Sequence, residues 1–205
     1  MIPEQYLSNP CKASSLPFWK TNRISLPPSM SVVRDDLFPG LQEGSIDTQY
    51  FRMLHRLKGL SPCTLSNCFS FTSVDEHSMA AHISHCYEEE RVSVEELKQY
   101  KKREVYSPDL WIGVKENDSE KLVATGIAEF DQEIKEGVLE WIQVSPEFRR
   151  RGLGRIVVNE LLSRLAKRAD FVTVSGRMNN PNNPYALYLN CGFETPVIWH
   201  VVRRE

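Results

Sequence analysis

One continuous stretch, residues 138–165 (VLEWIQVSPEFRRRGLGRIVVNELLSRL), restricts the fold of this chain more than any other part of it. Its first seven residues are rich in apolar side chains and β-branched at both ends, which predicts a short strand. Pro146 has no N–H to donate to a neighbouring strand, so strand pairing should stop there. Apolar residues then recur at helical spacing from Val158 to Ala169, which predicts an amphipathic helix.

The loop between this strand and this helix carries three consecutive arginines followed by Gly152 and Gly154. Main-chain N–H groups at the start of a helix have no partner inside the helix, so they can bind an anion. Glycines let phosphate oxygens approach the main chain closely, and arginines add charge-assisted hydrogen bonds. A solvated run of surface charge is the alternative reading. The glycines and the helix that follows at once favour an anion site, most simply one for a diphosphate.

The loop resembles the R/Q-x-x-G-x-G loop of the GNAT (GCN5-related N-acetyltransferase) superfamily, read here as Arg149-x-x-Gly152-x-Gly154. It matches neither G-x-x-x-x-G-K-[ST] nor a G-x-G-x-x-G that follows a strand. The segment VSPEFR at residues 144–149 is similar to the family's V-x-P-E-[FY]-R, and ALYLNCGF at 186–193 is similar to its A-L-Y-x-x-x-G-F. The resemblance is strong over residues 109–199, weak over 69–108 and absent from the first 45 or so.

This resemblance implies an α/β fold, a mixed central sheet flanked by helices that binds acetyl-CoA. In the family, the main chain of the loop holds the pyrophosphate of coenzyme A, the preceding strand pairs with the pantetheine arm, and an asparagine near the second segment often binds that arm. Prolines at 181 and 184 depart from the usual helical sequence, so either of two asparagines is a candidate. The implied CoA-binding residues are Ile142, Gln143, Val144, Arg149, Arg150, Arg151, Gly152, Leu153, Gly154, Arg155, Asn182 and Asn183.

Two residues are candidates for catalysis. Tyr188 lies four residues before Gly192 and matches the family tyrosine that protonates the departing thiolate, although a buried core tyrosine would read the same way. Glu140 is a carboxylate in an otherwise apolar strand, where an unpaired charge would be costly. Many members of the family have a glutamate on this strand that takes a proton from the amine. A salt bridge to a neighbour is the alternative role for Glu140.

Cysteines and histidines raise the question of a metal site. Cys63 and Cys68, followed by His82 and His85, loosely imitate the spacing of a zinc finger. The intervening FSFTSV is too apolar for a finger loop, and Cys86 directly after His85 makes a poor pair of ligands. We therefore expect no metal. His200 lies among apolar neighbours, which is typical of a hydrogen-bonded core histidine.

The composition limits the partners and the location of the protein. The net charge of −2 over 205 residues gives no bulk attraction to nucleic acid or to a membrane. No apolar run approaches about 20 residues, and the N-terminus lacks a signal pattern. Five scattered cysteines suit a reducing cytoplasm better than a disulfide framework, so the expected location is cytoplasmic. Homodimer formation is left open.

The chain is expected to form an ordered, proline-rich arm over residues 1–45 and a main domain over 46–205. Aromatic residues in the arm indicate packing on the main domain, either to cover a sheet face or to line the acceptor pocket. Little regular structure is expected in the arm. In the main domain, strands are expected over 48–60, 110–114, 122–130, 138–144, 171–175 and 197–202, with residues 63–72 as a hairpin partner of the first. Residues 132–137 are expected to form a polar connection, the strand over 171–175 to run parallel to its neighbour, and the last strand to close the sheet. Helices are expected from caps at Ser73 or Asp75, at Ser93, and over 185–190.

These features together predict an N-acetyltransferase that moves an acetyl group from acetyl-CoA to a small-molecule or peptide amine by direct attack. The developing oxyanion would meet a main-chain N–H near Val144. An acyl-CoA-binding protein of the same fold, with another acyl donor or without transfer activity, is the first alternative. A zinc-dependent interaction module is the second.

Overall fold

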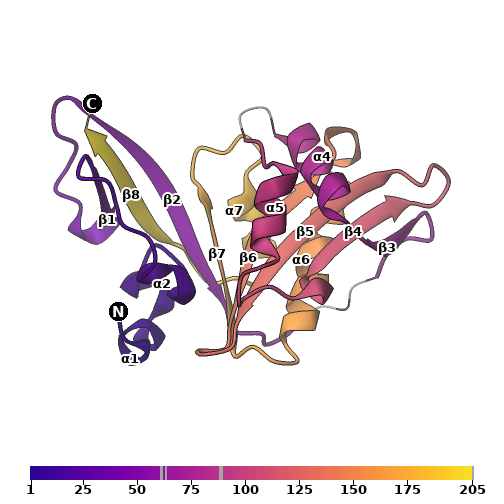
Figure 1. Cartoon of the computed structure of the whole chain (residues 1–205), viewed down its shortest axis with the longest axis horizontal. Helices are drawn as coiled ribbons and strands as arrows, with labels where there is room; N and C mark the ends of the chain where they lie inside the picture. The colour runs from indigo at the N-terminus through magenta and orange to yellow at the C-terminus, as the bar shows by residue number, and fades with distance from the viewer. Residues whose placement is uncertain (61, 63, 88–89, 205) are drawn as a thin grey trace.

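The computed structural model describes residues 1–60, 62, 64–87 and 90–204. Within these residues, eight strands form one mixed sheet in the order β1-β8-β2-β7-β6-β5-β4-β3, with helices on both faces (Figure 1). The mixed α/β sheet flanked by helices is confirmed. The strands are β1 (Met30–Arg34), β2 (Ser45–His55), β3 (Phe69–Ser73), β4 (Trp111–Glu116), β5 (Leu122–Asp131), β6 (Glu136–Val144), β7 (Phe171–Arg177) and β8 (Val197–Arg204).

The helices divide into a short N-terminal set and a set that covers the main sheet. The first set is α1 (Pro3–Ser8), α2 (Pro10–Ala13) and α3 (Phe18–Thr21), and the second is α4 (Glu76–Cys86), α5 (Val94–Tyr100), α6 (Leu153–Leu165) and α7 (Pro184–Asn190). Three 3-10 turns, η1 (Asp35–Leu37), η2 (Pro108–Leu110) and η3 (Pro146–Phe148), complete the described elements. None of the described helices is both long enough and apolar enough to cross a membrane.

Two apolar cores lie on opposite faces of the sheet because side chains alternate along each strand. On β4, Ile112 packs in the core that contains the buried face of α6. Its neighbour Trp111 packs in a second core, with Met79 of α4 and Leu97 of α5. Figure 1 shows α4 and α5 in front of β5 and β6, with α6 behind them. The helices thereby fix the positions of β5 and β6.

Several local predictions are confirmed by the structure. The helix after the arginine loop runs over Leu153–Leu165, and β7 pairs with β6 in the parallel direction. Asp75 rather than Ser73 caps α4, whereas Ser93 and Glu96 form the expected capping box of α5. Gly192 follows α7 with a φ of 90°, the left-handed conformation that glycine adopts without strain.

Strands β6 and β7 separate halfway along their length. They pair from Glu136 opposite Phe171 to Leu139 opposite Val174, and no pairs follow. On the other side of β6, the register with β5 shifts between Gly126 and Ala128, so β6 bends where it leaves β7. Figure 1 shows the two parts of the sheet close together at the bottom of the view and diverging toward the top. The separation leaves the main chain of β6 after Leu139 without a strand on the β7 side.

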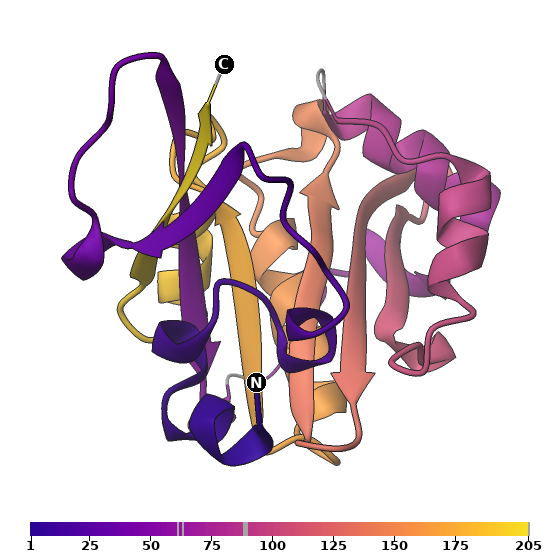
Figure 2. The ribbon, with the colours of Figure 1, turned by 60° about the vertical axis from the view of Figure 1, so that its left-hand side comes forward.

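The N-terminal segment has more regular structure than the sequence predicted. It forms three short helices, and its strand β1 adds an antiparallel edge to β8. Figure 2 shows this segment in front of the strands that follow it. Tyr6 is fully buried, and its hydroxyl donates to Glu136 Oε1 at 2.6 Å. Arg52 of β2 donates to the Tyr6 oxygen at 2.6 Å, so a buried polar cluster joins the segment to the sheet.

Three predictions about pairing and boundaries were wrong. Residues 63–72 are not a hairpin partner of β2, because β3 pairs with β4 at the opposite edge of the sheet. The last strand does not close the sheet, since β1 lies beyond β8. The connection expected over 132–137 is shorter, because Glu136 and Gly137 already belong to β6. Each error concerns partners distant in sequence or a boundary, which local patterns specify weakly.

Candidate active site

The main chain of Ile142 and Val144 faces the gap between β6 and β7. Successive residues of a strand direct their N–H and C=O groups to alternate sides. Ser145 N donates to Val123 O of β5 at 2.9 Å, so Val144 and Ile142 point the other way. Consistent with this direction, the Tyr87 hydroxyl donates to Ile142 O at 3.3 Å, and Arg149 Nε donates to Val144 O at 3.2 Å.

Gln143, one of the predicted CoA-binding residues, does not face the gap. Its main chain pairs with Thr125 of β5, and its side chain is 4% exposed. The side-chain amide donates to the Thr125 hydroxyl and contacts Met79 Sδ of α4. The alternation of a strand explains the placement, because Gln143 lies between the two residues that face the gap.

The start of α6 offers unpaired donors next to the gap. Gly152 precedes the helix with a φ of 81°, and no side chain caps it. The first helical hydrogen bond runs from Ile156 N to Gly152 O at 3.1 Å, so the N–H groups of the preceding turn have no partner within the helix. A Cβ on Gly152 would meet nothing within 4 Å. The loop therefore fits a diphosphate, which would accept from these donors.

The arginines of this loop have different roles. Arg149 connects three segments around the site. Besides Val144 O, its guanidinium donates to Cys86 O at 3.0 Å and to Asn182 Oδ1 at 2.8 Å. The Arg151 guanidinium lies over the Phe148 ring, 4.8 Å from its centre. Arg150 and Arg155 are exposed. The guanidiniums available to phosphates are therefore chiefly those of Arg150 and Arg155, rather than that of Arg149.

The remaining predicted CoA residues have identifiable local contacts. Leu153 is buried in the core below the loop. A Cβ on Gly154 would lie 3.4 Å from Leu187 of α7, so this glycine faces a helix and not open space. Asn183 Oδ1 caps α7 by accepting from Ala186 N at 3.3 Å. Asn182 Oδ1 accepts from Arg149 Nη1 at 2.8 Å, so the Asn182 side chain lies next to the loop.

Tyr188 lies on α7 in a nearly closed environment. It is 5% exposed, and its ring packs 6.0 Å from the Phe51 ring and 5.5 Å from the Phe193 ring, measured between centres. Burial raises the pKa of its phenol, and the charges of Tyr87, Cys191 and Glu140 raise that pKa further. The contact with Phe51 places the Tyr188 ring beside β2, which lies beyond β7 from β6 in the sheet.

Glu140 is the first residue of β6 beyond the paired segment. Its Oε1 accepts from Lys20 Nζ of α3 at 2.5 Å, and each side chain is 19% exposed. The salt bridge expected as an alternative therefore exists, and its partner comes from the N-terminal segment. Glu140 also raises the pKa of Glu129 on β5, after the larger effect of burial, to about 7.

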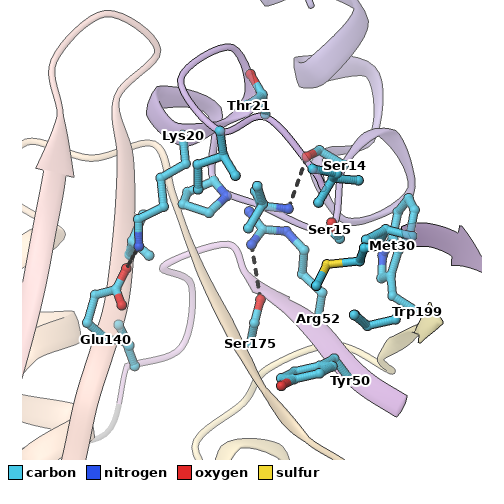
Figure 3. Close-up of a pocket in the computed structure, with 18 residues that line it drawn as sticks. Ser14, Ser15, Lys20, Thr21, Met30, Tyr50, Arg52, Glu140, Ser175 and Trp199 are labelled. Carbon is cyan, nitrogen blue, oxygen red and sulfur yellow. Dashed lines mark hydrogen bonds and ion pairs between the residues drawn. The ribbon is translucent and has the colours of Figure 1, made fainter. Parts of the chain in front are cut away.

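A pocket of about 460 Å³ opens beside Glu140, between the N-terminal segment and the sheet. Figure 3 shows Lys20 and Glu140 on one side of it and Met30 and Trp199 on the other. Ser175 of β7 lies between them, and its hydroxyl accepts from Arg52 Nη1 at 3.1 Å. The volume is in the range of pockets that bind small organic molecules.

Sequence reasoning missed Tyr87 and Lys20. Tyr87 was not a candidate, yet its hydroxyl donates to Ile142 O and its ring packs edge-on against Trp141. Lys20 lies 120 residues from Glu140 along the chain, and no local pattern connects them. The aromatic content of the N-terminal segment was the signal that it packs on the domain.

The zinc alternative finds no support among the described residues. They contain no group of three or more His, Cys, Asp or Glu side chains able to hold a metal ion. His82 contacts the hydroxyls of Thr125 and Ser145 at 2.9 and 3.0 Å in a buried cluster. Cys63, one of the proposed ligands, lies outside the described residues. His200 contacts Asp47 and Asp35 at 2.7 and 3.0 Å, so it is a hydrogen-bonded histidine as expected.

Comparisons with known proteins identify a protein family and a shared fold. The family model described as "Acetyltransferase (GNAT) family" matches residues 75–193, which is 119 of the 205 residues. A search of the curated proteins found none that matches the chain.

Solved structures share the fold at low sequence identity. A GCN5-related N-acetyltransferase from Sphaerobacter thermophilus is 18% identical, with a TM-score of 0.68 over 79% of this chain and 53% of that one. A structure from Novosphingobium aromaticivorans described as a GNAT-family acetyltransferase is 16% identical, with a TM-score of 0.57 over 89% and 70%. The ribosomal-protein-S18-alanine N-acetyltransferase of Escherichia coli is 20% identical, with a TM-score of 0.52 over 66% and 93%. This chain spans about half the length of the first of these.

Proposed function

Because this chain belongs to the acetyltransferase (GNAT) family, we propose that it transfers an acetyl group from acetyl-CoA to the nitrogen of an amine. One observation supports this most strongly: the part of β6 that has no partner on the β7 side runs from Glu140, which lines the pocket, toward the unpaired donors before α6. A long donor lying in the gap would therefore place its acyl end beside the pocket. The acceptor would enter from the side of the N-terminal segment.

In this proposal, the N–H groups of Gly152, Leu153, Gly154 and Arg155 hold the diphosphate. The main chain of Ile142 and Val144 binds the pantetheine arm, in place of the strand partner that β6 lacks beyond Leu139. When bound, acetyl-CoA supplies a thioester carbonyl carbon that an amine can attack. The C=O groups of Ile142 and Val144 already accept from Tyr87 and Arg149. The main-chain N–H groups of Ile142 and Val144 are therefore the donors available to the pantetheine arm.

The chemistry needs one proton acceptor and one proton donor. An acceptor that arrives as an ammonium first passes one proton to Glu140, which releases it to solvent. As the neutral amine attacks, the N–C bond forms and the C–S bond breaks, so the nitrogen loses a second proton and the thiolate gains one. Glu140 takes the proton from the amine once the acceptor has replaced Lys20 as the partner of its carboxylate. Tyr188 gives its proton to the thiolate, and its raised pKa keeps the phenol protonated at neutral pH until then.

The experiment is an acetyl-CoA titration by calorimetry, followed by thiol release across polyamines, amino acids, aminoglycosides and peptide N-termini. Acetyl-CoA should bind, and at least one class of amine should release CoA. The mass of that amine should rise by about 42 Da, the change that acetylation of the nitrogen gives in mass spectrometry. Absence of acetyl-CoA binding would contradict the proposal. Binding of a longer acyl-CoA instead would favour the alternative acyl donor. The odd number of cysteines supports a reducing, cytoplasmic location for this activity.

A further inference from the structure

The ion pair between Lys20 and Glu140 restricts which amines can use the pocket. We propose that the acceptor is an α-amino acid with an apolar side chain. Its ammonium group pairs with Glu140 in place of Lys20, and its carboxylate pairs with Lys20 in place of Glu140. This inference rests on the proposed function, because it assigns Glu140 to the acceptor site. It names a substrate class that the family alone does not specify.

Binding of an amine to Glu140 affects the Lys20 ammonium, which is the present partner of that carboxylate. Lys20 Nζ lies 2.5 Å from Glu140 Oε1, and both side chains are four-fifths covered. An amine that binds Glu140 Oε1 takes the place of the Lys20 ammonium. A partly buried charge without a partner is unfavourable, so an acceptor that brings only an ammonium group exchanges one ion pair for another and leaves Lys20 unpaired. An acceptor that also carries a carboxylate pairs with both residues.

The position of the acceptor's carboxylate is restricted as well. Lys20 and Glu140 are in direct contact, so the two groups that replace this contact must themselves be adjacent (Figure 3). In an α-amino acid, the nitrogen and the carboxylate are attached to the same carbon. Arg52, the other cation of the pocket, is already paired with Glu136 at 3.1 Å and is 1% exposed. The Lys20 ammonium is therefore the cation that an incoming carboxylate can reach.

The lining of the pocket restricts the rest of the acceptor. Of the eighteen described residues that line the pocket, ten are apolar, and Lys20, Arg52 and Glu140 are the charged ones. A polyamine or aminoglycoside would bring several positive charges to a pocket with a single carboxylate. Met30 and Trp199 instead lie opposite the ion pair (Figure 3), and Val32 and Val201 add further apolar lining to the pocket. Such a lining favours a branched aliphatic or aromatic side chain.

The test compares leucine with 3-methylbutylamine, which has the same side chain and amine but lacks the carboxylate. With acetyl-CoA fixed, kcat/KM for leucine should exceed that for the amine by about 10- to 100-fold, the range for one hydrogen bond to a charged group. Lys20→Met should bring this ratio close to one, whereas Lys20→Arg should retain most of it. Lys12→Met removes an exposed lysine of α2 that does not line the pocket and should leave the ratio unchanged.

Two outcomes separate this inference from the proposed function. If amines are acetylated but the carboxylate gives no advantage, or Lys20→Met keeps the advantage, the amino-acid inference is overturned and acetyl transfer stands. If no amine is acetylated, calorimetry with leucine in the presence of CoA still decides. Binding of leucine that Lys20→Met weakens supports the inference, and absence of leucine binding overturns it.

Discussion

At the residue scale, the role of Tyr188 depends on a single oxygen atom. Tyr188→Phe keeps the ring between Phe51 and Phe193, so the melting temperature and the acetyl-CoA affinity should barely change. If the phenol is the proton donor, kcat should fall about 10²-fold or more. Tyr185→Phe, on the same helix, is the matched control and should keep wild-type kcat. An unchanged kcat in Tyr188→Phe would make this tyrosine a packing residue.

The buried histidine of α4 makes stability depend on pH. Burial lowers the pKa of His82 to about 4, below its ordinary value near 6.5. The unfolded chain therefore takes up a proton at this residue as pH falls through 6.5, and the folded chain takes it up only near 4. Stability from neutral His82 is present above pH 6.5 and is lost between 6.5 and 4, by up to about 1.4 kcal/mol per pH unit.

This prediction is tested by denaturant unfolding of wild type and His82→Gln at several pH values. Gln does not titrate, so the difference between the two free energies of unfolding isolates the histidine from Glu129, whose raised pKa acts in the opposite direction. Wild type should lose stability relative to the variant as pH falls from 6.5 to 4. A constant difference would show that His82 is not held neutral.

Individual site residues differed in how well the sequence could predict them. Tyr188, Gly152 and Glu140 were found from motifs because each lies at a fixed distance from a recognisable loop or strand. Lys20 could not be found, since its role depends on the fold bringing α3 to β6. Gln143 was included because the motif marks a whole strand, and only the pairing of that strand with β5 shows which of its residues face the gap.

At the element scale, the loop before α6 separates two glycines that look equivalent in the sequence. Gly152→Ala places a side chain at a φ of 81°, which should lower the free energy of unfolding by about 1–2 kcal/mol and weaken acetyl-CoA binding. Gly154→Ala should be tolerated, because its Cβ would make an ordinary contact with Leu187 at 3.4 Å. Thermal unfolding and calorimetry on both variants check this. Equal effects would mean that the backbone of Gly152 is not special.

The elements that build the site were predictable because their signals are local. The strand, loop and helix over residues 138–165 were visible from β-branched residues, Pro146 and helical periodicity. The strand β1 was not, because Met30–Arg34 gains its structure from pairing with β8, about 170 residues away in the chain. The separation of β6 from β7 was implied only by family resemblance, since nothing in either strand's composition ends the pairing at Leu139.

At the scale of the whole molecule, the N-terminal segment is joined to the sheet by a buried polar cluster. The Tyr6 hydroxyl donates to Glu136 and accepts from Arg52. Tyr6→Phe removes one donor from the carboxylate and one acceptor from the guanidinium, so the free energy of unfolding should fall by about 1–3 kcal/mol. Urea unfolding measures this, with Tyr106→Phe as the control. No loss of stability would show that the Tyr6 hydroxyl does not help to hold the segment on the sheet.

The same cluster links stability to the acceptor pocket. Arg52 holds Ser175 as well as Glu136, and the Phe18 N–H donates to Glu136 at 3.0 Å, two residues before Lys20. The segment that covers the sheet therefore also positions the partner of Glu140. Covering a sheet face and lining the pocket, which the sequence left as alternatives, are compatible in this geometry.

We propose that acetyl transfer takes place beside Glu140, at the point where β6 separates from β7. The most direct measurement is kcat/KM for acetyl transfer in Glu140→Gln, with the acetyl-CoA affinity measured on the same preparation. The variant keeps the shape of the side chain but cannot accept a proton. We predict an unchanged acetyl-CoA affinity and a kcat/KM lower by about 10²-fold or more. A variant that acetylates the same amine at the wild-type rate would contradict this account.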